Sequence, residues 1–308
     1  MPEFRNVSRQ NYNSLEASLT RQARTSPLGT VYFTLAYTYG HNLDNASGFR
    51  QRNSSVPAYL PQHFYASGDS DIRHRISFSG GWDLPFDRAW GRGPKRVTKG
   101  WSLYPILTWR TGFPFDVGAK APGRFDPTTP GPSGAGDPLL PNAELMAPIH
   151  YLDPRKKTTI NVIDYFSQIG NGSCGPYATT QITGNFFMDP NSLTNALYYN
   201  GDSSNPCFPT FDPVNNPSQR TYGLSRNFLR GPHQTNFDIA LAKTTPLMGD
   251  RVNLEFRVEA FNVFNHPEFA IPDSNVNDTF STFGQVISTG TFRGSAARIV
   301  QLAARLSF

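Results

Sequence analysis

The last eleven residues of the chain, Arg298 to Phe308, alternate between apolar side chains and polar or small ones. Counting back from the end, the apolar positions are Phe308, Leu306, Ala304, Leu302 and Val300. A period of two residues predicts a β-strand with one apolar and one polar face. Soluble domains usually end in a short tail that frays. A strand that ends together with the chain, on an aromatic residue, therefore favours a membrane-crossing strand over an ordinary sheet strand.

Six further stretches alternate in the same way over about 9–11 residues or more, the length that a tilted strand needs to cross a bilayer. The least regular one contains Pro105, which lacks the N–H that a strand ladder uses, so we expect a bulge or a local distortion there. Upstream of the C-terminal strand, the predicted strands are Tyr12–Arg21, Thr30–His41, Ile72–Leu84, Lys99–Phe115, Asn236–Thr245 and Arg251–Ala260.

The connections between these predicted strands alternate in length. The short ones are Gln22–Gly29, Pro85–Thr98 and Pro246–Asp250, and the long ones are Asn42–Asp71, Asp116–Thr235 and roughly His266–Ala297. Outer-membrane barrels have short turns on the periplasmic side and long loops outside the cell. A soluble sandwich gives no reason for this sorting. We therefore predict an all-β fold, an antiparallel up-and-down transmembrane barrel.

Charged residues gather on one face of the predicted strands. In a soluble sheet that face would meet solvent, whereas in a barrel it lines the lumen and the apolar face meets lipid; the alternation fits both. The arginines can pair with the glutamates across the lumen, or line a wide pore as a solvated ladder of charges. The candidate lumen charges are Arg73, Arg75, Asp238, Glu255, Arg257 and Glu259.

Composition supports a β protein. The chain has 308 residues, with 26 glycines, 26 prolines and 24 phenylalanines, and such a content suits strands and turns better than helices. No window reaches the roughly 18 consecutive apolar residues of a membrane helix. The net charge of +5 is spread thinly, so nucleic-acid binding is not expected. The basic stretch from Arg88 to Lys99 is interpreted as a solvated turn.

No motif for catalysis, metal binding or a cofactor is found. The six histidines are scattered, and no HExxH, GxSxG, P-loop or dinucleotide fingerprint occurs, so no enzyme activity and no cofactor are expected. His74 lies on an apolar face, where packing is the simpler role. Cys174 and Cys207 lie in the longest loop and are interpreted as a disulfide, with two free thiols as the alternative. Trp82, Trp101, Trp109, Tyr37 and Tyr39 are candidates for aromatic girdles at the membrane interfaces.

Several motifs together resemble one family. They are Asp71–Arg75 (DIRHR), Arg110–Phe115 (RTGFPF), Leu229–Pro232 (LRGP), Phe256–Phe269 (FRVEAFNVFNHPEF), Phe283-Gly284 and Arg298–Phe308. The series resembles the C-terminal barrel of TonB-dependent outer-membrane transporters, in particular the Oar-like group.

The resemblance implies a 22-stranded barrel that is filled by a plug and takes up a bulky nutrient with energy supplied through TonB. Residues 1–308 would then be a partial barrel domain of about seven strands, with 116–235 as a long extracellular loop. Expected partners are outer-membrane lipid, the barrel-assembly machinery, an unknown nutrient, and TonB and a plug domain if the chain is part of a longer one. The assembly signature would comprise Val300, Leu302, Leu306 and Phe308.

The chain shows no secretion signal at its N-terminus, which favours a C-terminal fragment of a longer protein of the cell outer membrane. Two alternative functions stay open at this stage. One is a passive, porin-like channel, from which an upstream coding sequence for a plug would distinguish the transporter. The other is a secreted, soluble β-sandwich that acts as a binding module.

Overall fold

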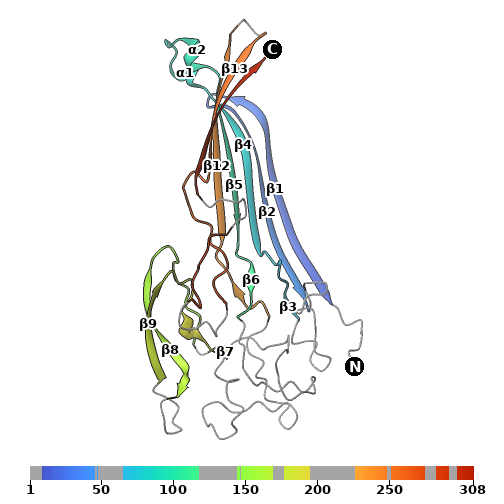
Figure 1. The fold of residues 1–308 in the computed structure, drawn as a ribbon. Helices are drawn as coiled ribbons and strands as arrows, with labels where there is room; N and C mark the ends of the chain where they lie inside the picture. The colour runs from blue at the N-terminus through green and yellow to red at the C-terminus, as the bar shows by residue number, and fades with distance from the viewer. Residues whose placement is uncertain are drawn as a thin grey trace.

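The computed structural model describes residues 9–45, 47, 65–117, 144–145, 147–168, 177–194, 226–247, 251–274, 282–290 and 297–308. Its main feature is one antiparallel sheet in which seven long strands follow each other in chain order, with the short β3 (Ala66–Ser67) added at β2 (Figure 1). All seven predicted strands are present. They are β1 (Gln10–Ser26), β2 (Gly29–Asp44), β4 (His74–Leu84), β5 (Trp101–Arg110), β12 (Gln234–Pro246), β13 (Asn253–Phe261) and β14 (Ile299–Ser307).

Two strand boundaries differ clearly from the prediction. The register of β1 against β2 shifts between Arg21 and Arg24, and such a bulge interrupts the alternation of side chains. This explains why the sequence pattern ends at Arg21 although the strand continues to Ser26. The stretch Lys99–Phe115 is shorter as a strand, because β5 ends at Arg110 and pairing resumes only in the short β6.

The expected distortion at Pro105 occurs without a bulge. Pro105 is paired with Ile239 of β12, and the register along this pair is unbroken. On the other side, the pairing of β5 with β4 skips Gly80 and Gly81 while keeping the same register. The N–H and C=O of a strand residue point to the same neighbouring strand. The missing N–H at Pro105 therefore interrupts the pairing of β5 with β4 and leaves the pairing of β5 with β12 intact.

The connections alternate in length as predicted, with the short turns at one end of the sheet and the long loops at the other (Figure 1). The longest loop is not featureless, because residues 116–235 include a hairpin, β8–β9, which alternation of period two did not reveal. None of the helices in the described ranges is long and apolar enough to cross a membrane. The shorter elements are α1 (Phe86–Ala89), α2 (Lys95–Thr98), β6 (Pro114–Phe115), β7 (Glu144–Leu145), β8 (Thr158–Gln168), β9 (Tyr177–Gly184), η3 (Pro190–Ser192), β10 (Leu193–Thr194) and β11 (Leu229–Arg230).

Burial on the sheet is the reverse of that in a soluble protein. In β12 the residues Asp238, Ala240 and Ala242 are buried, whereas Ile239 and Leu241 between them are only half-buried. The same holds on β13, where Phe256 and Val258 of the apolar face are exposed and Arg257 and Glu259 of the polar face are half-buried. An apolar face that meets no second layer of protein requires another apolar medium. This pattern contradicts the soluble sandwich and fits a sheet in lipid.

The polar face is the concave side of the sheet. The guanidinium of Arg257 on β13 lies 5.3 Å from the ring centroid of Tyr104 on β5, although β12 runs between these two strands. The side chains of β12 at this level are Ala240 and Ala242, whose small size lets the arginine cross above the strand. Contact between next-nearest strands on one face requires curvature toward that face, as in a barrel wall.

Aromatic side chains on the apolar face lie at two heights along the strands. Trp82 and Trp101 lie near the turn end of the sheet, and Tyr37 and Trp109 are paired with Ile76 at a level closer to the loops. Trp101 and Trp109 are eight residues apart on β5, which corresponds to about 26 Å along a strand, and somewhat less along the membrane normal when the strand is tilted. The apolar band of an outer-membrane barrel is about 25 Å tall, so the spacing suits two interfacial girdles.

Among the residues that the structure describes, the conventional apolar core lies outside the main sheet. Its buried residues are Phe115, Val117, Met188, Leu193, Leu229 and Phe283, with Ile149 packed against them. They come from the long loops and from β6 and β11, the two short strands that pair beyond the loop ends of β5 and β12. The loop region therefore folds around its own apolar cluster, and this cluster supports the pocket described next.

The sheet is open in the described part of the chain: β1 and β14 are its two ends and do not pair with each other. Every residue of β14 is exposed, and so is every residue of β1 except Ser26. An unpaired strand edge is not tolerated within lipid, because its N–H and C=O groups have no partners there. Strands β1 and β14 therefore require pairing partners if they lie within lipid.

Candidate functional site: a pocket at the loop end of the sheet

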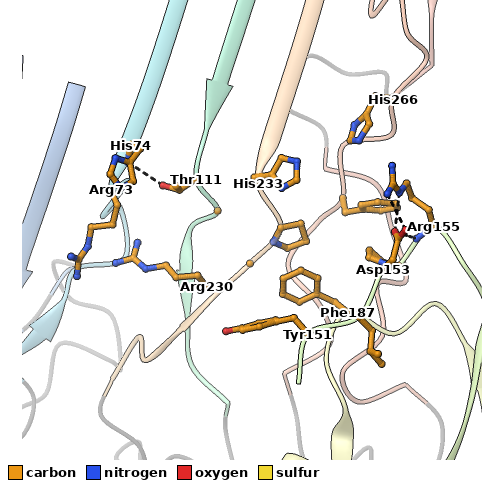
Figure 2. A pocket seen from close by; sticks show the side chains of 16 residues that line it. Arg73, His74, Thr111, Tyr151, Asp153, Arg155, Phe187, Arg230, His233 and His266 are labelled. Atoms are coloured by element: carbon orange, nitrogen blue, oxygen red, sulfur yellow. Dashed lines mark hydrogen bonds and ion pairs between the residues drawn. The ribbon is translucent and has the colours of Figure 1, made fainter. Parts of the chain in front are cut away.

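A pocket of about 930 Å³ lies where the strands meet the long loops (Figure 2). Its walls come from the start of β4, the segments that follow β5 and precede β12, the segment 151–155, and residues 187, 266 and 269. The side chains that dominate it are three arginines, three histidines and three aromatic rings: Arg73, Arg155, Arg230, His74, His233, His266, Tyr151, Phe187 and Phe269.

Two glycines bring the backbone segments of the wall close together. Gly112 follows β5, and Gly231 follows β11; a side chain at Gly112 would collide with the carbonyl oxygen of Gly231. The Gly231 N–H donates to the carbonyl of Phe113 at 2.9 Å. The glycine of the RTGFPF motif is thus explained by the close approach of two segments of the chain, whereas a side chain at Gly231 would make only ordinary contacts. The close approach places Arg230, the neighbour of Gly231, in the pocket wall.

Asp71 is a buried carboxylate that binds Arg73 and Arg230. We call these two arginines the cationic wall of the pocket. The side chain of Asp71 is 1% exposed and accepts hydrogen bonds from the Arg73 Nε at 2.9 Å and from the Arg230 guanidinium. It also accepts the backbone N–H of Asn42 at 2.8 Å and lies 3.2 Å from the Nδ1 of His41. Burial by itself would raise the pKa of Asp71, but these hydrogen bonds and charges outweigh it and leave the pKa below its usual value. The charged carboxylate therefore holds both arginines in place.

A second ion pair lies on the opposite wall. The guanidinium of Arg155 contacts both carboxylate oxygens of Asp153, at 2.8 and 2.9 Å, in a bidentate arrangement. The side-chain and backbone hydrogen bonds from Arg155 lower the pKa of Asp153 to about 2. The side chain of Arg155 is 56% exposed, so it is accessible to a ligand in a way that the arginines bound to Asp71 are not.

The aromatic part of the wall is formed by residues of the segment before β8 and the segment after β9. The rings of Tyr151 and Phe187 lie 5.3 Å apart, and the Leu152 N–H donates to the carbonyl of Phe187 at 2.8 Å. Burial raises the pKa of the Tyr151 hydroxyl, although a hydrogen bond from the backbone of Arg230 acts in the opposite direction. Tyr151 is therefore neutral at physiological pH, and its ring and hydroxyl are both available for contacts.

The histidines have different surroundings. His74 lies 2.9 Å through Nδ1 from the hydroxyl of Tyr37 and packs near the rings of Tyr37 and Tyr39, which agrees with the packing role expected from the sequence. His233 and His266 have ring centroids 6.3 Å apart. The Nδ1 of His266 is buried and has no hydrogen-bond partner in the described ranges. It is a free polar group beside the pocket.

The remaining predicted site residues are distributed over the sheet. Arg257 pairs with Glu259 on its own strand at 2.7 Å, and the carboxylate of Asp238 accepts the backbone N–H of Asn262 at 2.9 Å. Arg75 lies beside Arg110 in the register of β4 and β5, and Glu255 lies opposite Arg305 of β14. Within the described ranges, no ion pair joins Arg73 or Arg75 to Glu255 or Glu259.

Two further groups of residues were predicted from the sequence. Cys174 and Cys207, the predicted disulfide, lie outside the described residues. Val300, Leu302 and Leu306 lie on the apolar face of β14, and Phe308, just beyond it, is 93% exposed.

The sequence contained partial signals for the pocket. Arg73 was singled out as a lumen charge, and the motifs DIRHR and LRGP contain Asp71 and Arg230. Nothing in the sequence placed Tyr151, Arg155 and Phe187 beside them, because these residues belong to a loop hairpin that is far away in the chain. No group of three or more His, Cys, Asp or Glu side chains suited to a metal ion occurs among the residues that the structure describes.

The exposed apolar face, the sorted loops and the sheltered polar face define an integral outer-membrane protein of the β-barrel class. The family described as outer membrane beta barrel domain matches residues 1–301, and the chain belongs to this family. Its location is accordingly the outer membrane. No curated protein and no solved structure matches the chain.

Proposed function

We propose that this chain is the C-terminal part of the barrel of a TonB-dependent, Oar-like outer-membrane transporter, and that it takes part in binding and uptake of a nutrient. The observation that carries the proposal is the pocket at the loop end of the sheet, where a ligand from outside the cell would first meet the barrel. The protein acts in this proposal as a carrier and not as an enzyme. Its partners are lipid, the barrel-assembly machinery, a plug domain and TonB.

The open sheet supports the partial-barrel aspect of this proposal. Bacterial outer-membrane barrels contain an even number of strands, from eight upward, whereas the main path here has seven, with two unpaired edges. We propose that β1 and β14 pair with further strands of a longer chain. The series of motifs from DIRHR to the C-terminal strand, which resembles TonB-dependent transporters, supports the same conclusion.

The chemistry of the pocket supports a ligand that carries an anionic group next to a flat ring. Arg155 is half-exposed and held in a fixed orientation by Asp153, and a guanidinium binds carboxylate or phosphate through paired hydrogen bonds. Tyr151 and Phe187 offer ring faces nearby, suited to sugars or aromatic groups. Ferric siderophores, acidic oligosaccharides and peptides all combine these features.

The test is accumulation of such ligands by cells that express the full-length protein. Cells receive a mixture of a ferric siderophore, acidic oligosaccharides and peptides, and the periplasmic contents are measured by mass spectrometry with and without a protonophore. For a TonB-dependent transporter, one ligand accumulates and the protonophore abolishes this. A passive porin-like channel would admit small solutes equally under both conditions. That result would contradict the transporter and support the channel.

Replacing Arg155 by Gln should weaken binding of the accumulated ligand by about 10- to 150-fold, because a hydrogen bond to a charged group contributes about 1.5–3 kcal/mol. The matched control is Lys157→Gln, which removes an exposed cation that does not line the pocket. Binding is measured by isothermal titration on the purified protein in detergent. Equal affinities of the two variants would show that the ligand binds elsewhere.

A further inference from the structure

The connection between β4 and β5, residues 85–100, exposes three large apolar side chains. It contains α1 and α2 and lies at the turn end of the sheet (Figure 1). Phe86, Trp90 and Val97 are all exposed, and Trp90 is 73% exposed. Isolated exposed apolar residues need no explanation, but three in one short connection indicate an apolar neighbour. We call residues 85–100 the basic turn, because they also contain five cationic side chains.

The basic turn carries five cations and a single carboxylate, Asp87. None of these cationic side chains forms an ion pair with a described residue. Only one of them donates a hydrogen bond to a described residue, from Arg88 Nη1 to the carbonyl of Ser26 at 2.9 Å. Unpaired cations in this density attract an anionic partner. The cations are Arg88, Arg92, Lys95, Arg96 and Lys99, and all are exposed.

The apolar residues of the basic turn adjoin the lipid-facing surface of the sheet. The ring of Phe86 packs edge-on against Trp101, with centroids 6.4 Å apart, and the indole N–H of Trp101 donates to the carbonyl of Val97 at 2.7 Å. Trp101 lies on the apolar face, at the turn-end girdle. This places Phe86 and Val97 next to the hydrocarbon boundary, with the cations around them.

We propose that the basic turn binds the periplasmic surface of the outer membrane, with Trp90, Phe86 and Val97 at the boundary between acyl chains and headgroups and its cations on the phosphates of anionic phospholipid. Aromatic rings with a polar edge favour this depth. Long Lys and Arg side chains reach from it to the phosphates. The inference depends on the outer-membrane location and not on transport. It differs from the solvated turn that the sequence predicts.

The depth of Trp90 tests the apolar part of this proposal. The full-length protein is reconstituted into vesicles of phosphatidylcholine and phosphatidylglycerol, and tryptophan fluorescence of the wild type and of Trp90→Phe is compared, so that the difference reports Trp90. We expect lipid brominated close to the headgroup to quench the Trp90 component, and aqueous iodide to leave it unchanged. Quenching of this component by iodide alone would overturn the proposal.

The charges are tested by replacing Arg92, Lys95, Arg96 and Lys99 together with Gln. In vesicles with phosphatidylglycerol, quenching of Trp90 by brominated lipid should fall to the level that the wild type shows in phosphatidylcholine alone. Added salt should have the same effect on the wild type. Undiminished quenching in the variant would overturn the role of anionic lipid.

The matched control is Lys156→Gln with Lys157→Gln, which removes two exposed cations at the loop end and should leave Trp90 quenching unchanged. Because all the replaced residues are exposed, folding should be retained, and heat-modifiable migration on gels checks this. Should the quadruple variant not fold, the salt titration of the wild type decides: quenching that does not depend on salt overturns the role of anionic lipid.

Discussion

Replacing Leu302 by Arg should prevent stable assembly of the protein in the membrane. Leu302 lies in the middle of β14 on the apolar face and is 76% exposed. In a soluble protein, such an exposed position would tolerate arginine with a change within about 0.5 kcal/mol. On the lipid face of a barrel, arginine near the bilayer midplane costs about 2–4 kcal/mol, which corresponds to a factor of about 30 to 1000 in the folded-to-unfolded ratio.

The matched control is Gln301→Arg, one residue away on the same strand. Gln301 is on the polar face, directly opposite Glu259 in the register of β13 and β14, so the new cation gains a carboxylate neighbour and remains in water. The folded fraction is measured by heat-modifiable migration of outer-membrane extracts, and the stability by urea titration in lipid vesicles. If the two arginine variants were equally stable, the apolar face would not contact hydrocarbon.

Replacing Asp71 by Asn should release the cationic wall of the pocket. The substitution keeps the shape but removes the charge that faces Arg73 and Arg230. Loss of one partner of a buried ion pair costs about 3–5 kcal/mol. We expect the lower end of this range, about 3 kcal/mol, because the guanidinium groups keep 34% and 26% of their exposure.

The effect should be local and is best measured by hydrogen exchange. The backbone N–H of Asn42 donates to Asp71 at 2.8 Å, so its protection should fall by about two orders of magnitude if opening costs about 3 kcal/mol less. Asp153→Asn is the control, since it removes an exposed carboxylate whose ion pair contributes about 0–1 kcal/mol. Unchanged protection at Asn42 in the Asp71 variant would show that the wall is held by packing alone.

The same carboxylate makes the pocket sensitive to acid. The pKa of Asp71 is lower in the folded protein than its ordinary value of 3.8, so its contribution to stability is complete above that value. It is lost as the pH falls below 3.8 and through the folded pKa, when the carboxylate is protonated. The Asn42 amide should therefore lose protection in this acidic range in the wild type but show no such step in the Asp71→Asn variant.

The sheet could be predicted almost completely, because the alternation in each strand depends only on residues that are neighbours in the sequence. Alternation in Arg251–Ala260 or Arg298–Phe308 reports directly which side chains share a face, and the alternating loop lengths order the strands along the chain. The prediction ended too early at Arg21, where a bulge shifts the alternation, and it overran Arg110, where pairing is interrupted. Both errors lie where the backbone departs from the regular period.

The pocket could be predicted only in part, because its walls come from distant segments. Asp71 and Arg230 are 159 positions apart, and no period or motif states that they share a hydrogen bond. The same is true of Arg155 and of the hairpin β8–β9, whose placement follows from contacts of the loop core. The ion pairs considered between Arg73 or Arg75 and Glu255 or Glu259 do not form in the described ranges. Arg73 pairs with Asp71 instead, and Arg257 pairs with Glu259 on its own strand.

The amino-acid sequence alone determined that this protein is a β-barrel chain: the period of two and the loop lengths are properties of each strand and each connection. The alternation by itself could not show whether the apolar face meets lipid or a second layer of protein, since soluble and membrane sheets alternate identically. Tertiary structure decided that point, because only the curvature of the assembled sheet shelters Asp238 and Ala242 while leaving Phe256 and Val258 exposed. It likewise decided that Arg226 meets Asp44 and that Arg230 meets Asp71, because the members of these ion pairs are 182 and 159 positions apart in the chain.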